Sequence, residues 1–280
     1  MKIINTIHNL KNTIQQWQAE TCRIGFVPTM GYLHAGHLEL VKQAKNNCDR
    51  VVVSIFVNPL QFNQASDLDN YPTSLEEDQQ KLIAVKVDAL FLPDTKMMYP
   101  NGQAAITKIC VPEITDTLEG EHRPGHFDGV ATVVNKLFNL VQPQAAFFGE
   151  KDYQQLLLVK KMQADLNMPI EIHSVSTHRE IDGLAMSSRN ARLTDENRKK
   201  APELYRILQQ VSQQLKLGQL CIDVEVQAAA QLQAAGFEVE YISVRDRASL
   251  QSAHNNQKNR LVLAAAHLGS VRLIDNLIID

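Results

Sequence analysis

The chain has 280 residues, of which 44% are hydrophobic and 21% carry a charge. This length allows a substantial core in one or two domains, and the composition excludes disordered, collagen-like and disulfide-scaffold proteins. The net charge is only −3 and the longest run of Lys and Arg covers residues 198–200, so we expect neither a nucleic-acid interface nor a membrane-binding face.

Short apolar runs of β type alternate with segments of helical type between residues 20 and 176. The five strand candidates are Ile24–Val27, Val51–Val57, Ala89–Leu92, Ala145–Phe148 and Ile170–Val175. This alternation predicts a parallel sheet with crossover helices. The run from Val51 to Val57 is almost unbroken in apolar residues, which is typical of a central strand that is covered on both faces.

Two helices are expected between these strands. Ser74 and Glu77 have the S-x-x-E spacing of a capping box, and Leu75, Leu82 and Val85 then share one helical face. A second helical stripe precedes Pro143, which cannot continue a helix, and it consists of Val130, Val133, Val134, Leu137, Phe138 and Val141.

The pattern changes after about residue 177. A long helix is indicated by Leu204, Ile207, Leu208, Val211 and Leu215, and a second one by residues 227–235. Three strand candidates follow at residues 237–244, 261–266 and 271–278. We therefore predict an α/β protein with two domains: a Rossmann-like, doubly wound parallel sheet over residues 1–177 and a smaller α+β domain over residues 178–280.

The first strand of the Rossmann-like domain runs into a segment that suits a bound phosphate. Gly31 and Gly36 allow the backbone to approach a ligand closely, and a helical stripe begins at Leu38. Ligands of open α/β sheets bind beyond the carboxyl ends of the strands, where helix N-termini offer unpaired N–H groups. His34 and His37 would lie in the first helical turn, project to nearly the same side and stabilise charge on a reacting phosphate.

Two other interpretations of this H-x-x-H segment stay open from the residues alone. A metal pair is one, although the spacing is not H-E-x-x-H and the sequence indicates no third ligand. A structural loop with surface histidines is the other. The placement of the segment directly after the first of these strands favours the phosphate site.

The segment 28–37, with His34-Ala35-Gly36-His37, resembles the H-x-G-H nucleotidyltransferase superfamily and, within it, the pantoate–β-alanine ligase (pantothenate synthetase) family. Five further segments in the same order carry this resemblance over nearly the whole chain, and they lie at residues 54–62, 71–72, 118–127, 148–155 and 182–190. The resemblance implies an enzyme that uses ATP and Mg²⁺ to convert pantoate to a pantoyl adenylate and pyrophosphate. β-Alanine then attacks the adenylate, which yields pantothenate and AMP without a covalent enzyme intermediate.

The resemblance also assigns roles to residues of this chain. It implies catalytic roles for His37, which is the usual proton donor, and for His34, Lys151, Ser187, Ser188 and Arg189. The implied ATP contacts are Pro28, Thr29, Met30, Gly31, Tyr32, Leu33, His34, Ala35, Gly36, His37, Gly149, Glu150, Lys151, Asp152, the backbone of His178, Met186, Ser187, Ser188 and Arg189. Gln61, Gln155 and Asn58 are the implied pantoate contacts, and the metal ligands are not identified.

The chemistry of these residues agrees with the implied roles. Lys151 follows the strand that ends near Phe148, where a cation can neutralise charge on phosphates, although a surface lysine is the alternative. The loop with Ser187 to Arg189 can fold over a triphosphate, or it is a solvated turn. Gln61 and Gln155 are uncharged groups that suit a small polar acid, or they are ordinary surface residues. Arg123 is a further candidate for phosphate or dimer contacts.

One residue departs from the family pattern. Many members carry Arg after the Tyr-Pro pair, and this chain has Thr73, which puts any phosphate or interface role of that Arg in doubt. The resemblance further implies a homodimer that is formed through the N-terminal domain. We expect the C-terminal domain to act as a lid, because water must be kept from a reactive acyl adenylate.

The chain is expected to be cytoplasmic. Its start lacks the apolar stretch of a signal peptide, and its apolar runs are shorter than the roughly 20 residues of a membrane-spanning helix. The four cysteines are scattered at positions 22, 48, 110 and 221 without C-x-x-C spacing, which argues against a structural zinc site and for reduced thiols.

Two rival functions stay open from the sequence. One is another adenylyl- or cytidylyltransferase with the H-x-G-H motif, which would need a cationic pocket for a phosphorylated acceptor. The uncharged Gln61 and Gln155 disfavour it. The other is a catalytically silent nucleotide-binding or dimerisation module, which the intact set of His34, His37 and Lys151 disfavours together with residues 187–189.

Overall fold

The computed structural model describes residues 1–255 and 257–279. The chain divides into two compact units, and we describe each by itself. The N-terminal unit comprises Met1–Glu150 and Gln155–Ser176, and the C-terminal unit comprises Lys151–Gln154 and Thr177–Asp280. The boundary between domains at residues 177 and 178 stays a prediction.

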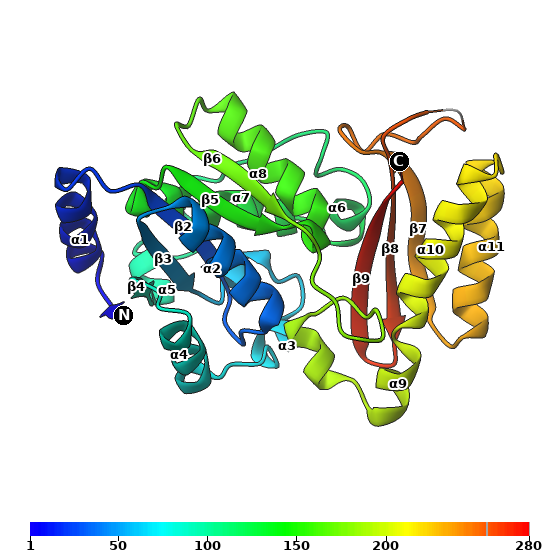
Figure 1. The fold of residues 1–280 in the computed structure, drawn as a ribbon, viewed down its shortest axis with the longest axis horizontal. Helices are drawn as coiled ribbons and strands as arrows, with labels where there is room; N and C mark the ends of the chain where they lie inside the picture. Colours follow the sequence, from blue (N-terminus) through cyan, green and yellow to red (C-terminus); the bar gives the residue numbers. More distant parts are fainter. Residues whose placement is uncertain (256, 280) are drawn as a thin grey trace. The chain divides into compact units, whose positions relative to one another are not determined.

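A six-stranded, entirely parallel sheet forms the centre of the N-terminal unit (Figure 1). Its strand order is β1-β4-β3-β2-β5-β6. The strands are β1 (Lys2–Ile4), β2 (Ile24–Thr29), β3 (Arg50–Ile55), β4 (Ala89–Phe91), β5 (Ala145–Gly149) and β6 (Glu171–Val175). The predicted parallel sheet and all five of its predicted strands are confirmed.

The position of β3 is also confirmed. This strand pairs with β2 on one side and with β4 on the other, and Val51, Val52 and Val53 are fully buried. The edge strand β1 was not expected from the sequence. Its only apolar residues are Ile3 and Ile4, and a run of two is too short to indicate a strand. Of the three residues of β1, only Ile4 is buried.

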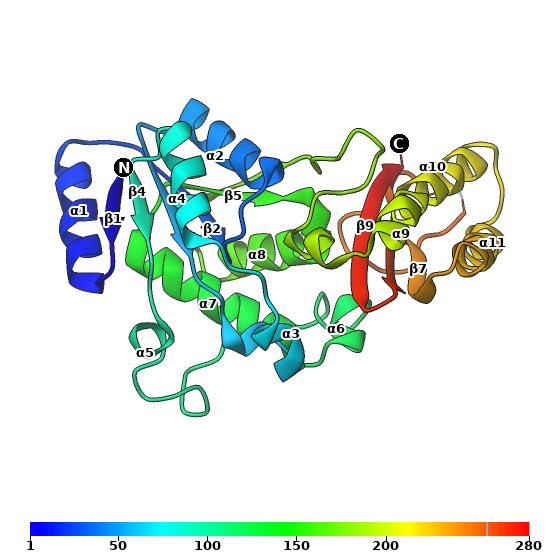
Figure 2. The same cartoon turned by 90° about the horizontal axis from the view of Figure 1, so that it is seen from below.

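Helices cover both faces of this sheet, as Figure 2 shows. On one face, α2 (Ala35–Asn47) and α4 (Leu75–Ala84) contribute Val41 and Leu82 to a core with Val27 and Val53. The other face carries α7 (His126–Val141) and α8 (Tyr153–Asp165). Phe138 of α7 lies there between two strands, because its ring meets those of Phe26 and Phe148 edge-on.

The remaining helices of the N-terminal unit are α1 (Ile7–Ala19), α3 (Ala65–Asp69), α5 (Thr95–Met98) and α6 (Glu119–His122), with a short 3-10 helix, η1 (Pro59–Gln61). A second 3-10 helix, η2 (Glu150–Asp152), begins with the last residue of the segment Met1–Glu150 and continues into Lys151 and Asp152 of the C-terminal unit. The predicted helices after Ser74 and before Pro143 are present as α4 and α7. The capping box at Ser74 is not formed, since the Ser74 hydroxyl makes no cap hydrogen bond. It lies instead 3.4 Å from the carboxylate of Asp78, one turn further along α4.

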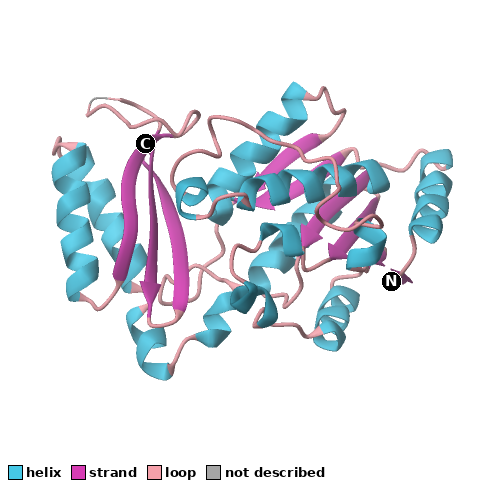
Figure 3. Ribbon diagram, turned by 180° about the vertical axis from the view of Figure 1, so that it is seen from behind, coloured by secondary structure: helices cyan, strands magenta, loops and turns pink. Residues whose placement is uncertain are grey.

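The C-terminal unit contains a three-stranded antiparallel sheet in the order β7-β8-β9, with helices packed on it (Figure 3). Its elements are η3 (Ser188–Arg192), α9 (Asp195–Lys200), α10 (Glu203–Lys216), α11 (Cys221–Ala234), β7 (Glu238–Asp246), β8 (Arg260–Leu268) and β9 (Val271–Ile279). The predicted smaller α+β part is confirmed. Helix α11 starts at Cys221, earlier than the prediction of residue 227.

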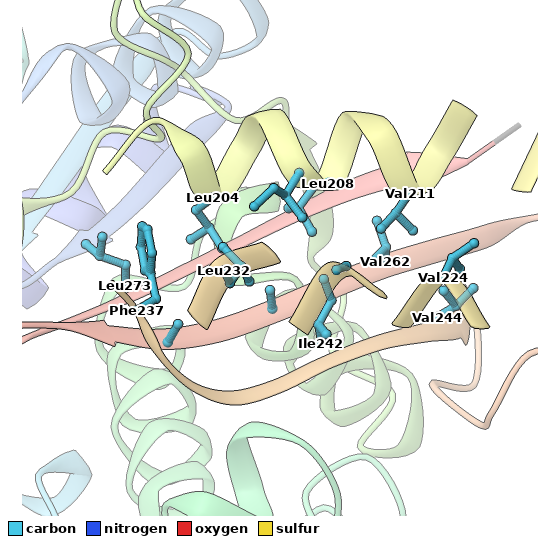
Figure 4. Close-up of a cluster of buried hydrophobic side chains, with 14 of the residues drawn as sticks. Leu204, Leu208, Val211, Val224, Leu232, Phe237, Ile242, Val244, Val262 and Leu273 are labelled. Carbon is cyan, nitrogen blue, oxygen red and sulfur yellow. The ribbon is translucent and has the colours of Figure 1, made fainter. Parts of the chain in front are cut away.

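Apolar side chains of α10, α11 and the three strands meet in one core, which Figure 4 shows. Leu208 of α10, Leu232 of α11 and Val262 of β8 are fully buried in it. The early turns of α11 also expose Ile222 and Val226. This mixture of exposed and buried apolar residues obscured the start of the helix in the sequence.

No helix within the part of the chain that the structure describes is long and apolar enough to cross a membrane.

Candidate active site

The loop between β2 and α2 contains a sharp turn that requires glycine. Gly31 has a φ of 85° and the following Tyr32 has a φ of 51°, so the chain takes the left-handed region twice. A Cβ atom on Gly31 would lie 3.0 Å from Cγ2 of Ile55 and 3.2 Å from Oδ2 of Asp78. The turn therefore has no room for a larger residue unless its neighbours move.

Asp78 of α4 holds this loop in place. Its two carboxylate oxygens accept hydrogen bonds from the backbone N–H groups of Tyr32 and Leu33, both at 2.7 Å. Asp78 is buried, with 1% of its surface exposed. Lys81, one turn later on α4, donates from Nζ to the carbonyl oxygen of Leu33 at 2.8 Å. Since charge-assisted hydrogen bonds are the stronger ones, these contacts fix the backbone that leads into His34.

We expected both histidines to lie in the first helical turn, but only His37 does. His34 has an extended backbone, with φ −126° and ψ 176°, and is the N-cap residue of α2, whereas His37 is its third residue. The two rings are nevertheless close, with centroids 4.0 Å apart. The backbone N–H of His34 donates to Nδ1 of His37 at 3.3 Å. A neutral imidazole that accepts at Nδ1 carries its hydrogen on Nε2, so His37 presents a donor there.

The strand order reverses next to β2, which lies between β3 and β5. Loops that follow adjacent parallel strands on either side of such a reversal diverge, and ligands of this fold class bind between them. The loop from Met30 to His34 follows β2, and Gly149 is the last residue of β5. The carboxyl edge of the sheet at β2 and β5 is therefore the candidate ligand site of the N-terminal unit.

Asn58 and Gln61 form a buried polar pair at η1, which follows β3. Nδ2 of Asn58 donates to Oε1 of Gln61 at 3.0 Å, and Nε2 of Gln61 lies 3.0 Å from Sδ of Met30. Helix α7 comes close to η1 because residue 129 is glycine. A Cβ atom at Gly129 would lie 2.3 Å from the carbonyl oxygen of Leu60.

The backbone of Gln61 is held as firmly as its side chain. Nδ1 of His126 lies 2.7 Å from the carbonyl oxygen of Gln61, and because a carbonyl can only accept, this nitrogen carries the hydrogen. Nε2 of the same ring lies 3.1 Å from Nη1 of Arg123, which therefore donates to it. Arg123 is also 3.6 Å from the carboxylate of Glu119, which is buried. Arg123, a candidate for phosphate or dimer contacts, thus takes part in holding Gln61.

Gln155 is half-buried and lies in the first turn of α8, directly after Gln154, which is buried. Gln155 belongs to the N-terminal unit, as do Asn58, Gln61, residues 28–37, Gly149 and Glu150. The C-terminal unit contains the other predicted residues, Lys151, Asp152, His178 and residues 186–189. The structure thus distributes the predicted site residues over both units.

Lys151 and Tyr153 are tied to β9 and to the turn that follows β7. The carbonyl oxygen of Lys151 accepts a hydrogen bond from Nδ2 of Asn276 at 2.9 Å. Two residues later, the hydroxyl of Tyr153 accepts from Nε of Arg247 at 3.0 Å. The Lys151 side chain is half-buried, whereas Asp152 is exposed. The contacts of its backbone, more than its own burial, hold Lys151 in position.

Arg179 anchors the segment that precedes the predicted Ser187 to Arg189 loop. It donates from Nη1 and Nη2 to the two carboxylate oxygens of Asp275, at 2.6 and 2.9 Å. Its guanidinium carbon lies 3.5 Å from the centroid of the Tyr205 ring. Burial raises the pKa of the Asp275 carboxyl, whereas the bonds from Arg179 favour its ionised form. The bidentate geometry is that of an ion pair.

The loop from Met186 to Arg189 continues from this anchor. The backbone N–H of Met186 donates to the carbonyl oxygen of His178 at 3.0 Å. Ser187 is the N-cap residue of η3, and its Oγ accepts from the backbone N–H of Arg189 at 3.3 Å. Ser188 is buried, with 7% exposed, while Ser187 and Arg189 are half-buried. The loop is therefore an ordered part of the C-terminal unit.

Residues that hold the predicted site residues were missed in the sequence. Asp78 stands in a run of charged residues on an amphipathic helix, where one buried carboxylate has no separate signal. Asp275 stands two residues after Leu273 on β9, in the alternation of Val271, Leu273 and Ile279 that faces the core, and a charge at such a position could have indicated it. Asp275 and Asn276 are consecutive on β9, so their side chains point to opposite faces. One strand thereby holds both Arg179 and Lys151.

Within the described residues, no group of three or more His, Cys, Asp or Glu side chains could hold a metal ion. The alternative of a metal pair at His34 and His37 therefore gains no third protein ligand there. The four cysteines, all in that part of the chain, are unpaired.

Comparison with known proteins points to one enzyme family. The family model for pantoate-beta-alanine ligase matches residues 2–278. A pantothenate synthetase of Pseudomonas putida is 50% identical over 278 residues, which are 99% of this chain and 97% of that protein. The crystal structure of pantothenate synthetase from Thermus thermophilus has 43% identity and a TM-score of 0.93, with 99% of each chain covered.

A further solved structure bears on ligands. It is a pantoate-beta-alanine ligase from Francisella tularensis, in complex with beta-gamma ATP and β-alanine. This chain is 37% identical to it, with a TM-score of 0.85, and the match covers 99% of this chain and 97% of that one.

Asp78→Asn should destabilise the protein by about 2 kcal/mol, because an amide nitrogen would face one of the two backbone N–H groups and leave it buried without an acceptor. The free energy of unfolding in urea measures this loss. Asp94→Asn is the matched control. Asp94 is exposed and accepts from the backbone N–H of Met97 at 2.6 Å as the N-cap of α5, a position where Asn serves as well as Asp. Equal losses in the two variants would contradict the role of Asp78.

Proposed function

The chain belongs to the pantoate–β-alanine ligase family, and we propose that it condenses pantoate with β-alanine at the expense of ATP. The observation that carries this proposal is the family match over residues 2–278. In the first step a pantoate carboxylate oxygen attacks the α-phosphorus of ATP, and the bond to pyrophosphate breaks. In the second step the neutral amine of β-alanine attacks the acyl carbon of the adenylate, the amide forms, AMP leaves and a proton is released.

We propose that the loop from Pro28 to His37 binds the phosphates of ATP. Its position after β2 and before α2 supports this, because a helix N-terminus stabilises negative charge. His37 would donate from Nε2 to a phosphate oxygen as charge grows on it. The hydrogen bond that His37 accepts at Nδ1 supports this role, since it leaves Nε2 as the donor. His34, whose ring lies beside that of His37, would help to stabilise the same charge.

Residues of the C-terminal unit would act on the same phosphates. Lys151 supplies a positive charge, and Ser187, Ser188 and Arg189 supply hydroxyl and guanidinium donors for the leaving pyrophosphate. The remaining ATP contacts would come from Gly149, Glu150, Asp152, Met186 and the backbone of His178. The contacts of Asn276 and Arg179 support these roles, because they hold the backbone at Lys151 and before Met186.

Pantoate would be bound by Gln61 and Gln155, with Asn58 beside them. Neutral amides orient a carboxylate without pairing it with a cation, so the carboxylate keeps its nucleophilicity. The buried position of Gln61 and its double attachment through Asn58 and His126 support a role in which its orientation matters.

Four further features belong to this proposal. Mg²⁺ would accompany ATP and offset the negative charge of its phosphates. The enzyme would be a homodimer formed through its N-terminal part. It would reside in the cytoplasm, where its unpaired cysteines stay reduced. Residues 1–177 and 178–280 would form its two domains, with the second as a lid.

Sustained release of AMP and pyrophosphate from ATP should require both pantoate and β-alanine, because the adenylate turns over only when the amine attacks it. The measurement is a coupled assay for both products with Mg²⁺, in which each substrate is omitted in turn. Release of pyrophosphate only in the presence of a phosphorylated acceptor would favour another nucleotidyltransferase. ATP binding without any release would favour a silent binding module.

His37→Ala and Lys151→Ala should each lower the rate of adenylation roughly a hundredfold or more, the scale of losing one preorganised transition-state donor. Single-turnover formation of pyrophosphate from ATP and pantoate measures that step. His8→Ala and Lys11→Ala, which change exposed residues of α1, are the matched controls and should keep the full rate. Unchanged rates in both site variants would refute the assigned roles.

Gln155→Ala should raise the KM for pantoate and leave the affinity for ATP nearly intact, because the amide is assigned to the acid substrate. Initial rates with each substrate varied in turn separate the two effects. Gln163→Ala, at the far end of the same helix, is the control. A selective loss of ATP binding in Gln155→Ala would place the residue in the nucleotide site.

A further inference from the structure

A buried chain of hydrogen bonds leads from Tyr99 through Asn58 to Gln61. The Tyr99 hydroxyl donates to Oδ1 of Asn58 at 2.7 Å, and Nδ2 of Asn58 donates to Oε1 of Gln61 at 3.0 Å. The three residues expose only 3%, 1% and 9% of their surface, in that order. Burial raises the pKa of the Tyr99 hydroxyl well above its ordinary value, so this group keeps its hydrogen and stays a donor.

Two backbone groups fix which end of the Asn58 amide is the oxygen. Oδ1 accepts from the backbone N–H of Leu60 at 3.3 Å, and Nδ2 donates to the carbonyl oxygen of Gly129 at 3.1 Å. A reversed amide would set an N–H against the N–H of Leu60 and an oxygen against the carbonyl of Gly129. The orientation of Asn58 therefore follows from groups that cannot change their polarity.

All hydrogen-bonding capacity of Asn58 is used within the protein. An amide side chain has two hydrogens to donate and an oxygen with two lone pairs. The two hydrogens go to Gln61 and Gly129, and the oxygen accepts from Tyr99 and Leu60. Asn58 therefore has no group left for a substrate, which differs from the contact that the family resemblance implied.

The polarity of Asn58 sets the polarity of Gln61. Because Oε1 of Gln61 accepts from Asn58, the other end of the amide is the donor Nε2. Its partner in the protein is the thioether sulfur of Met30 at 3.0 Å, which is only a weak acceptor. Met30 stands in the loop after β2, at the candidate ligand site. An oxygen of a ligand would be a better acceptor for Nε2 than this sulfur.

We propose that Asn58 is a positioning residue that acts through Gln61, and that it selects substrates by hydrogen-bond polarity. Held by Tyr99 and by backbone groups, it makes Gln61 offer N–H to the ligand, so the site prefers an acid, whose carboxylate only accepts, over the corresponding amide, which also donates. This inference rests on the proposed function, because pantoate is the acid in question.

Asn58→Asp tests the inference by reversing the polarity. A carboxylate at this position only accepts, so Gln61 would turn Nε2 toward it and present Oε1 to the ligand. The probes are pantoate and its carboxamide, each titrated by calorimetry against the wild type and the variant. The preference for pantoate over the amide should fall at least tenfold in Asn58→Asp. In Asn58→Ala, which removes the contact without reversing it, the preference should fall less, although both ligands bind more weakly.

A preference that is the same in Asn58→Asp and the wild type would overturn the inference, even if both ligands bind more weakly, since a purely structural role predicts equal losses. If the wild type itself neither binds nor uses pantoate, the proposed function falls and this inference falls with it. The two failures are thus distinguished by the wild-type titration.

Tyr99→Phe decides the matter if Asn58→Asp does not fold, because it removes one hydroxyl and keeps the ring. The KM for pantoate should rise about fivefold, the equivalent of one net hydrogen bond of about 1 kcal/mol, while the KM for ATP stays unchanged. Tyr241→Phe, on β7, is the matched control and should change neither KM. An unchanged KM for pantoate in Tyr99→Phe, or equal rises for both substrates, would overturn the inference.

Discussion

The pairing of β2 with β3 on one side and with β5 on the other is the constraint on which the N-terminal unit depends. It places the reversal of strand order between β2 and β5. At the carboxyl end of β2 the chain must turn sharply to enter α2. Gly31 makes that turn possible, and the carboxylate of Asp78 holds it. The sheet determines where the ligand site lies, and a buried charge from a neighbouring helix determines its detailed shape.

The two units hold their predicted site residues by the same principle. In each, a buried polar residue that lies outside the predicted site uses its hydrogen bonds to fix a backbone segment within it. His126 does so for Gln61 in the N-terminal unit, and Asn276 does so for Lys151 in the C-terminal unit. Since a buried polar group without a partner costs free energy, each such residue favours one arrangement of its segment over all others. Rigidity of this kind is what preorganised catalysis requires.

The sequence predicted the sheet well because its signals are local. The run of residues 51–57 is apolar except for Ser54, and the helical stripe before Pro143 repeats over about three turns. The predictions failed where the deciding contact is distant in the chain. Ser74 has the spacing of a cap, yet its hydroxyl approaches Asp78, whose carboxylate is turned toward the loop after β2. His34 lies before α2 instead of within it, a difference of one residue that periodicity cannot resolve.

Residues 151–154 have a consequence for how this chain can be divided. They are grouped with the C-terminal unit although the chain on both sides of them belongs to the N-terminal unit. A gene fragment that starts at Thr177 would therefore lack the carbonyl of Lys151 and the hydroxyl of Tyr153, the acceptors for Asn276 and Arg247. The C-terminal unit is thus not an exchangeable module. Recombination at one point between the units would separate residues 177–279 from residues 151–154, which belong to the same unit, and would remove these contacts.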